Sequence, residues 1–147
     1  KAEKLYSETG NETAYLESLY LQAEALFRQQ QDEKAEEILR RIISYAGTHT
    51  TAFHVANAYS LLGLSFMRRG ELSRAKGLFQ QSLEQEQKND RWIGQVCDYA
   101  NIGLLELRSG KNEQAQTHLQ AAYELAQALG DTELAEKIKV NLDKLKS

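Results

Sequence analysis

The feature that most constrains this chain is an internal repeat with a period of 40 residues. Sliding the sequence by that distance aligns residues 59–83, YSLLGLSFMRRGELSRAKGLFQQSL, with residues 99–123, YANIGLLELRSGKNEQAQTHLQAAY. A weaker copy lies one period earlier and is carried by Leu19, Ala23, Arg28, Gln30, Ala35 and Leu39. A fixed period of about 20–50 residues indicates a repeat array, in which each unit packs on the next.

Each copy reads as two helices joined by a short turn. The first helix carries a small residue, Ala23, Gly63 or Gly103, where a partner helix must approach closely. The second helix carries apolar and small residues at spacings of four and three, which places them on one helical face. These residues are Ala75, Phe79 and Ser82 in one copy and Ala115, Leu119 and Ala122 in the next. The sequence has no proline, which fits an all-helical chain because proline breaks helix interiors.

This pattern resembles the tetratricopeptide repeat, in which an aromatic-x2-Leu-Gly-x2-aromatic motif precedes Ala-x3-Phe and a small residue. The second copy fills the template at Tyr59, Leu62, Gly63, Phe66, Ala75, Phe79 and Ser82. The third copy keeps Tyr99, Ile102, Gly103, Ala115, Leu119 and Ala122, but has Glu106 at the second aromatic position.

Two further departures concern the whole repeat. Each copy lacks the terminal proline of the family, and the period is 40 residues instead of about 34. We expect longer helices and a longer joint between helix pairs to absorb the difference. The copies are similar to the lengthened repeats of kinesin light chains, spindle-orientation adaptors, and bacterial regulatory or sensory proteins.

The resemblance implies an all-α fold, a right-handed superhelical α-solenoid of about three helix pairs. The predicted pairs are 12–46, 51–88 and 90–129, with a partial helix at 1–9 and a capping helix at 132–146. The individual helices are expected near 12–30, 32–46, 51–69, 72–88, 90–109 and 112–129. Because each repeat contacts only its neighbours, residues 1–147 are expected to form a single array. The chain begins with Lys1 and not Met, so we expect it to be a piece of a longer protein.

The composition excludes two classes of partner. The net charge of −3, from 18 basic and 21 acidic residues, does not provide the basic face that nucleic-acid binding needs. Charged residues interrupt every apolar run well short of the roughly 20 residues of a membrane span, so no membrane insertion is expected.

No group of side chains predicts catalysis, a metal site or a cofactor, so we expect a protein that is not an enzyme. His49 and His54 are five residues apart, which is not the spacing of two ligands on one helical face. Cys97 is expected to be a small packed residue and not a nucleophile. His118 is expected to be isolated and exposed. Trp92 is expected to pack between helix pairs, or alternatively to anchor a partner at the surface.

The resemblance also implies a binding surface, because in this family residues of the first helix of each pair line a concave groove. The matching positions in the first pair are Glu17, Tyr20, Glu24, Phe27 and Arg28. Those in the second pair are Asn57, Ser60, Leu64, Met67 and Arg68, and those in the third are Cys97, Ala100, Leu104, Leu107 and Arg108. Asn101 matches an asparagine that, in several branches of the family, hydrogen-bonds the backbone of an extended peptide.

Two features of this set have alternative interpretations. An apolar floor made of Leu64, Met67, Leu104 and Leu107 either binds a partner or is buried against the neighbouring pair. A ladder made of Arg28, Arg68 and Arg108 either engages carboxylates or a phosphate of a partner, or stabilises the C-terminal ends of its own helices.

The sequence therefore predicts a non-enzymatic interaction module that binds a peptide, a helix or a neighbouring domain of the same parent chain. The alternative is a sensory or scaffold segment of a larger bacterial regulator that acts through self-association, as a homo-oligomer, or through a signalling peptide.

Overall fold

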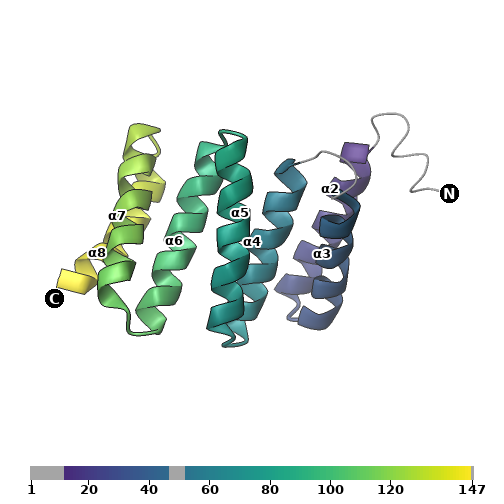
Figure 1. The fold of residues 1–147 in the computed structure, drawn as a ribbon, viewed down its shortest axis with the longest axis horizontal. Helices are drawn as coiled ribbons and strands as arrows, with labels where there is room; N and C mark the ends of the chain where they lie inside the picture. Colours follow the sequence, from purple (N-terminus) through teal and green to yellow (C-terminus); the bar gives the residue numbers. More distant parts are fainter. Residues whose placement is uncertain (1–11, 47–51, 147) are drawn as a thin grey trace.

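The structure is a computed structural model that describes residues 12–46 and 52–146. The described residues form helices α2 (Glu12–Arg28), α3 (Asp32–Ala46), α4 (Ala52–Arg68), α5 (Leu72–Lys88), α6 (Trp92–Arg108), α7 (Asn112–Ala128) and α8 (Thr132–Lys146). These bounds lie within two residues of the predicted ones. The helix predicted at 1–9 lies outside the described residues. The helices stand side by side in a row that follows the order of the chain, as expected for an α-solenoid (Figure 1).

Helix length accounts for the 40-residue period. Helices α4, α5, α6 and α7 have 17 residues each, and three residues separate each helix from the next. Two such helices with their turns make up one period. The joint between pairs at 89–91 is as short as the turn within a pair at 69–71, so the expectation of a longer joint is wrong. The extra length lies in the helices.

The turns share one hydrogen-bonding pattern. After α4, the N–H of Glu71 bonds to the carbonyl of Phe66 at 2.9 Å, and that of Gly70 bonds to Met67 at 3.0 Å. This pattern is the Schellman motif, which needs a left-handed residue just past the helix. Gly70 supplies it with φ 83°, and Gly110 and Gly130 do so after α6 and α7. Gln30 (φ 61°) and Asp90 (φ 52°) take the same conformation without a glycine to mark it in the sequence.

The small residues of the first helices allow close approach, as predicted. A Cβ atom on Gly63 would lie 2.8 Å from Cε1 of Phe79, and one on Gly103 would lie 2.6 Å from Cγ of Leu119. Phe79 and Leu119 are fully buried. The second and third pairs are therefore each closed by a large side chain of the second helix, which is seated over a glycine of the first helix.

The packing also defines an inner side of the array. Successive helices pack on each other, and among the first helices α2 additionally contacts α4, and α4 contacts α6. The second helices α3, α5 and α7 make no comparable contact with one another in the part of the chain that the structure describes. Because the first helices approach one another more closely, the stack curves toward them, and their outer surface is the concave side.

A bilayer-crossing helix is not found among the described helices.

Candidate functional site on the first helices

The positions predicted to line the groove follow one face of each first helix. In α6, Cys97, Ala100, Leu104 and Leu107 are spaced by three, four and three residues, which keeps them on one side. The equivalent positions of α2 and α4 lie 80 and 40 residues earlier. We call this set of residues, together with Arg28, Arg68, Arg108 and Asn101, the first-helix surface.

The apolar residues of the first-helix surface are half-buried. Leu64 and Met67 pack against the core formed by α2–α6, and Leu107 packs against the core formed by α6–α8. Leu104 is half-buried as well. These side chains support the packing of the array and also remain partly accessible on the concave side.

The polar residues of the surface differ in how far they are accessible. Glu17 and Cys97 are exposed, whereas Asn57, Ser60 and Asn101 are half-buried. The expectation that Cys97 is a packed residue is therefore wrong. The Ser60 hydroxyl forms a hydrogen bond with the Asp98 carboxyl of the next first helix. Partial burial of the sulfur, together with the carboxylate of Asp98, raises the pKa of the Cys97 thiol. The nucleophilic thiolate is therefore disfavoured at Cys97.

Burial also acts on Tyr20, where it raises the pKa of the phenol. Tyr20 and Phe27 are half-buried on α2 and pack against the same core as Leu64. The α2 end of the surface therefore presents two aromatic side chains beside Glu17 and Glu24.

The arginine ladder connects neighbouring pairs. Arg68 donates to the carbonyl of Phe27 at 2.8 Å, pairs with the Asp32 carboxylate, and lies over the Phe27 ring at 3.8 Å. Arg108 donates to the carbonyl of Met67 at 3.0 Å. Both acceptors lie in the last turn of the preceding first helix, where carbonyls lack partners within the helix. Arg28 forms an ion pair with Glu24 of its own helix at 3.4 Å, and its side chain is 72% exposed.

Two exposed apolar residues of this surface were missed in the sequence. Ile93 lies four residues before Cys97, and Val140 lies 40 residues after Ala100, so both continue the same face. Ile93 is 51% exposed and Val140 is 55% exposed. Continuing the helical spacing back by four residues from Cys97 would have found Ile93, and adding one more 40-residue period after Ala100 would have found Val140.

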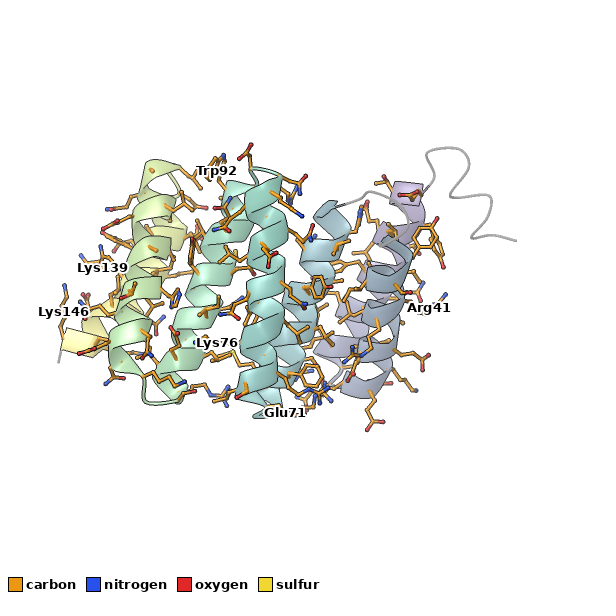
Figure 2. The ribbon with its side chains drawn as sticks, in the orientation of Figure 1. Arg41, Glu71, Lys76, Trp92, Lys139 and Lys146 are labelled. Carbon is orange, nitrogen blue, oxygen red and sulfur yellow. The ribbon has the colours of Figure 1, made fainter. Side chains whose placement is uncertain are left out.

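Trp92 lies next to Ile93 at the start of α6, at the upper edge of the array in Figure 2. It is 47% exposed, so the expectation that it packs between helix pairs is wrong. Its role as a surface anchor for a partner stays a prediction.

The buried acidic residues are held by partners inside the fold. Glu106 is fully buried and accepts from Lys76 Nζ at 3.0 Å, and its other oxygen lies 2.7 Å from Nδ1 of His118. The expectation of an isolated, exposed His118 is therefore wrong. Glu86 pairs with Arg91 at 2.9 Å. These carboxylates form intramolecular contacts, and no described cluster of three or more His, Cys, Asp or Glu residues is suited to hold a metal ion.

Asp98 forms the joint between the second and third pairs. Its carboxyl accepts from Ser82 Oγ of α5 at 2.6 Å, and only 1% of the residue is exposed. Burial raises the pKa of Asp98 to about 7, an effect that the Ser82 and Ser60 hydrogen bonds oppose and that the nearby Glu86 charge reinforces. The joint therefore contains an acid that titrates near neutral pH.

Two family models described as tetratricopeptide repeat match this chain, one over residues 54–128 and the other over residues 17–48. The chain belongs to the tetratricopeptide repeat family, whose members are in general protein-interaction scaffolds and not enzymes. No curated protein sequence matches this chain.

Two solved structures with the same fold illustrate the architecture. BtubC (BKLC) from P. vanneervenii is 20% identical, with a TM-score of 0.84 over 98% of this chain and 59% of its own. The apo form of RapI is 18% identical, with a TM-score of 0.85 over 99% of this chain and 53% of its own. This chain spans little more than half of either structure. The two likenesses establish an all-α solenoid of the tetratricopeptide type.

Proposed function

We propose that this chain is a non-enzymatic interaction module that binds a peptide, a helix or a neighbouring domain along the first-helix surface. The observation that carries the proposal is the partly accessible apolar path over α4 and α6, formed by Leu64, Met67, Leu104 and Ile93. The two helices contact each other, so the path spans adjacent helices. Apolar side chains that remain accessible on a concave face favour a partner with its own apolar side chains.

Charge along the surface suggests the orientation of the partner. Glu17 and Glu24 lie on the α2 part of the surface, whereas Lys137 and Lys144 occupy the matching face of α8. A bound segment with a basic end near α2 and an acidic end near α8 would match both ends. Because Glu17, Lys137 and Lys144 are exposed, we expect these charges to affect the association rate and its salt dependence more than the affinity.

The proposal of a non-enzymatic role is supported by the buried titratable residues. Glu86 and Glu106 are both held by ion pairs, and Asp98 by serine hydroxyls, so each has a packing role. A catalytic site needs such groups turned toward a substrate, within reach of a nucleophile or an oxyanion donor.

The test uses peptides selected from a random library on the immobilised chain, because no partner needs to be known in advance. Ile93→Glu and Leu64→Glu should weaken binding of the selected peptides by tenfold or more, since each places a charge on the apolar path. The matched control is Leu129→Glu, which changes an exposed leucine in the turn after α7 that is not part of the apolar path.

Circular dichroism melting of each variant shows whether it remains folded. Unchanged affinity in folded Ile93→Glu and Leu64→Glu would exclude the first-helix surface as the binding site. An equal loss in Leu129→Glu would exclude it as well.

The alternative role, a sensory or scaffold segment of a larger bacterial regulator, stays a prediction.

A further inference from the structure

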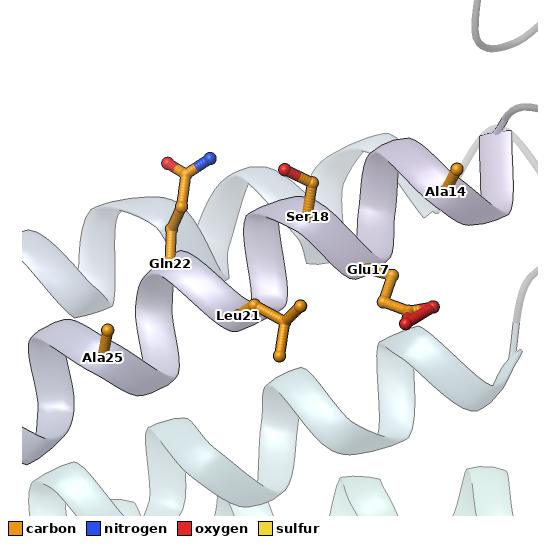
Figure 3. Close-up of a pocket in the computed structure, with 6 residues that line it drawn as sticks. All are labelled: Ala14, Glu17, Ser18, Leu21, Gln22 and Ala25. Atoms are coloured by element: carbon orange, nitrogen blue, oxygen red, sulfur yellow. The ribbon is translucent and has the colours of Figure 1, made fainter.

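The first helix of the array has an exposed face that resembles an interface. Six residues of α2 line an open hollow of about 590 Å³: Ala14, Glu17, Ser18, Leu21, Gln22 and Ala25. Figure 3 shows these side chains spread along the helix. Leu21 is 55% exposed, although its neighbours Leu19 and Ala23 are buried in the core on the opposite side. This face is distinct from the apolar path of the proposed function.

The repeat shows what this face does in the other pairs. Ala14, Ser18, Leu21 and Ala25 correspond to His54, Ala58, Leu61 and Ser65 of α4, which are all buried. The same positions in α6 are Gly94, Asp98, Asn101 and Leu105. There, Asp98 bonds to Ser82 of α5, and a Cβ on Gly94 would overlap the Glu86 carboxylate of α5. In both later pairs, this face of the first helix receives the second helix of the preceding pair.

Arg28 supports the same conclusion independently. Its counterparts Arg68 and Arg108 reach across to a last-turn carbonyl of the preceding first helix. Arg28 has the same register, but its ion pair is with Glu24 of its own helix. Its guanidinium therefore lies where it could donate to the end of a further first helix placed ahead of α2.

We propose that the exposed face of α2 is a docking surface for a helix pair of the same repeat type. The second helix of that pair packs on Ser18, Leu21 and Ala25, and the last turn of its first helix accepts from Arg28. The occupant follows from continuity with the α3–α4 and α5–α6 interfaces, which the exposed face reproduces position by position.

The far end of the array indicates why the occupant is not the tail of a second copy. The outward face of α8 presents Glu136, Lys139, Asp143 and Lys146, all exposed. Figure 2 places Lys139 and Lys146 at that end of the row. Of the six residues that line the hollow on α2, Glu17 alone is charged, so burying the four charges of α8 there would leave most of them without water or an opposite charge, which is costly.

The test supplies a helix pair of known structure. Residues 52–91 are inserted between Asn11 and Glu12 of the full chain, which preserves the 40-residue period up to α2. A thiol is introduced by Ser18→Cys in a Cys97→Ser background. We expect one cooperative urea transition at a higher midpoint than that of the parent, because each repeat is stabilised by its neighbour. We also expect at least tenfold slower alkylation of the introduced thiol.

The matched control carries Leu21→Glu. This change should leave the parent chain folded and equally stable, because Leu21 is largely exposed, but should abolish both effects of the insertion. A separate unfolding transition for the inserted pair, with unchanged alkylation, would overturn the proposal. Sedimentation velocity on the unmodified chain tests whether a second copy of the chain occupies this face instead. A monomer at all concentrations agrees with the proposal, whereas a dimer abolished by Leu21→Glu contradicts it.

Discussion

The second and third helix pairs have the same geometry but different chemistry at one buried position. Phe66 in the second pair and Glu106 in the third are 40 residues apart and are both inaccessible to solvent. Phe66 has the guanidinium groups of Arg69 and Arg74 over its ring, at 4.3 and 4.4 Å. Glu106 instead has Lys76 and His118 at its two carboxylate oxygens.

The difference shows that a repeat specifies backbone geometry more strictly than it specifies side-chain chemistry. In both pairs, a cationic side chain from α5 reaches the buried group, which is a ring in one case and a carboxylate in the other. Cations are attracted to the face of an aromatic ring as well as to an anion. The third pair, however, contains buried charge that must stay compensated, whereas the second pair does not.

The largest expected effect is therefore the loss of that compensation. Lys76→Met leaves a fully buried Glu106 with His118 as its remaining partner, and we expect it to lower the free energy of unfolding by about 3–5 kcal/mol. Urea denaturation measures the change. The matched control is Lys137→Met, which breaks an exposed pair with Glu133 and should cost less than about 1 kcal/mol.

A double variant sharpens this comparison. Glu106→Met combined with Lys76→Met gives the third pair an apolar centre like that of the second. It should recover most of the lost stability, because an apolar replacement of a buried ion pair is often neutral or stabilising. If the double variant is less stable than Lys76→Met alone, the third pair depends on its carboxylate for more than charge compensation.

The second prediction concerns the pH dependence of the third pair. The pKa of Asp98 is raised from 3.8 to about 7, so the folded protein binds this proton more tightly than the unfolded chain does. Stability contributed by the protonated form is fully present below about pH 4 and is lost as the pH rises toward 7. The raised pKa of Glu86 acts in the same direction.

Asp98→Asn should remove most of this dependence. The asparagine can still accept from Ser82 but carries no charge, so the variant should exceed the parent in stability above about pH 7, by at most about 4 kcal/mol. Urea midpoints across that pH range measure it, with the exposed Asp143→Asn as the control. Parallel pH profiles for Asp98→Asn and the parent would mean that Asp98 does not titrate in this range.

Most of the fold could be predicted from the sequence, because the information is periodic. The glycines at 63 and 103, the turn glycines at 70 and 110 and the Ala-x3-apolar spacing each recur after 40 residues, and each corresponds to a close approach, a cap or a core contact. What could not be predicted lies where one copy departs from the others. Asp90 ends a helix without glycine, and Glu106 recruits His118 from a different helix.

The first-helix surface could be predicted less completely. Spacing identifies which face a residue occupies, but not whether a neighbouring pair already uses it. Arg68 and Arg108 lie at the predicted register, yet both donate to the preceding first helix. Ile93 was missed because the matched positions of α6 begin after it, at Cys97, and Val140 was missed because no positions of α8 were matched to the family motif. Pairing across the joint depends on three-dimensional packing that a single sequence does not show.

The smallest expected effect tests whether the two pairs also differ in how tightly they close. Gly63→Ala would place a methyl group 2.8 Å from the Phe79 ring, and Gly103→Ala would place one 2.6 Å from Cγ of Leu119 and 3.3 Å from its backbone nitrogen. Overpacking should cost about 1–3 kcal/mol, partly offset by the roughly 1 kcal/mol that alanine gains over glycine in a helix. We expect Gly103→Ala to cost more, because backbone atoms yield less readily than a tilting ring.

Gly77→Ala on α5 is the control: its Cβ meets nothing within 4 Å, so it should stabilise the chain by about 1 kcal/mol. Urea midpoints of the three variants measure these changes in stability. Equal gains at all three sites would show that helix propensity, and not close contact, sets the effect of alanine at these glycines. A destabilised Gly77→Ala would contradict the prediction as well.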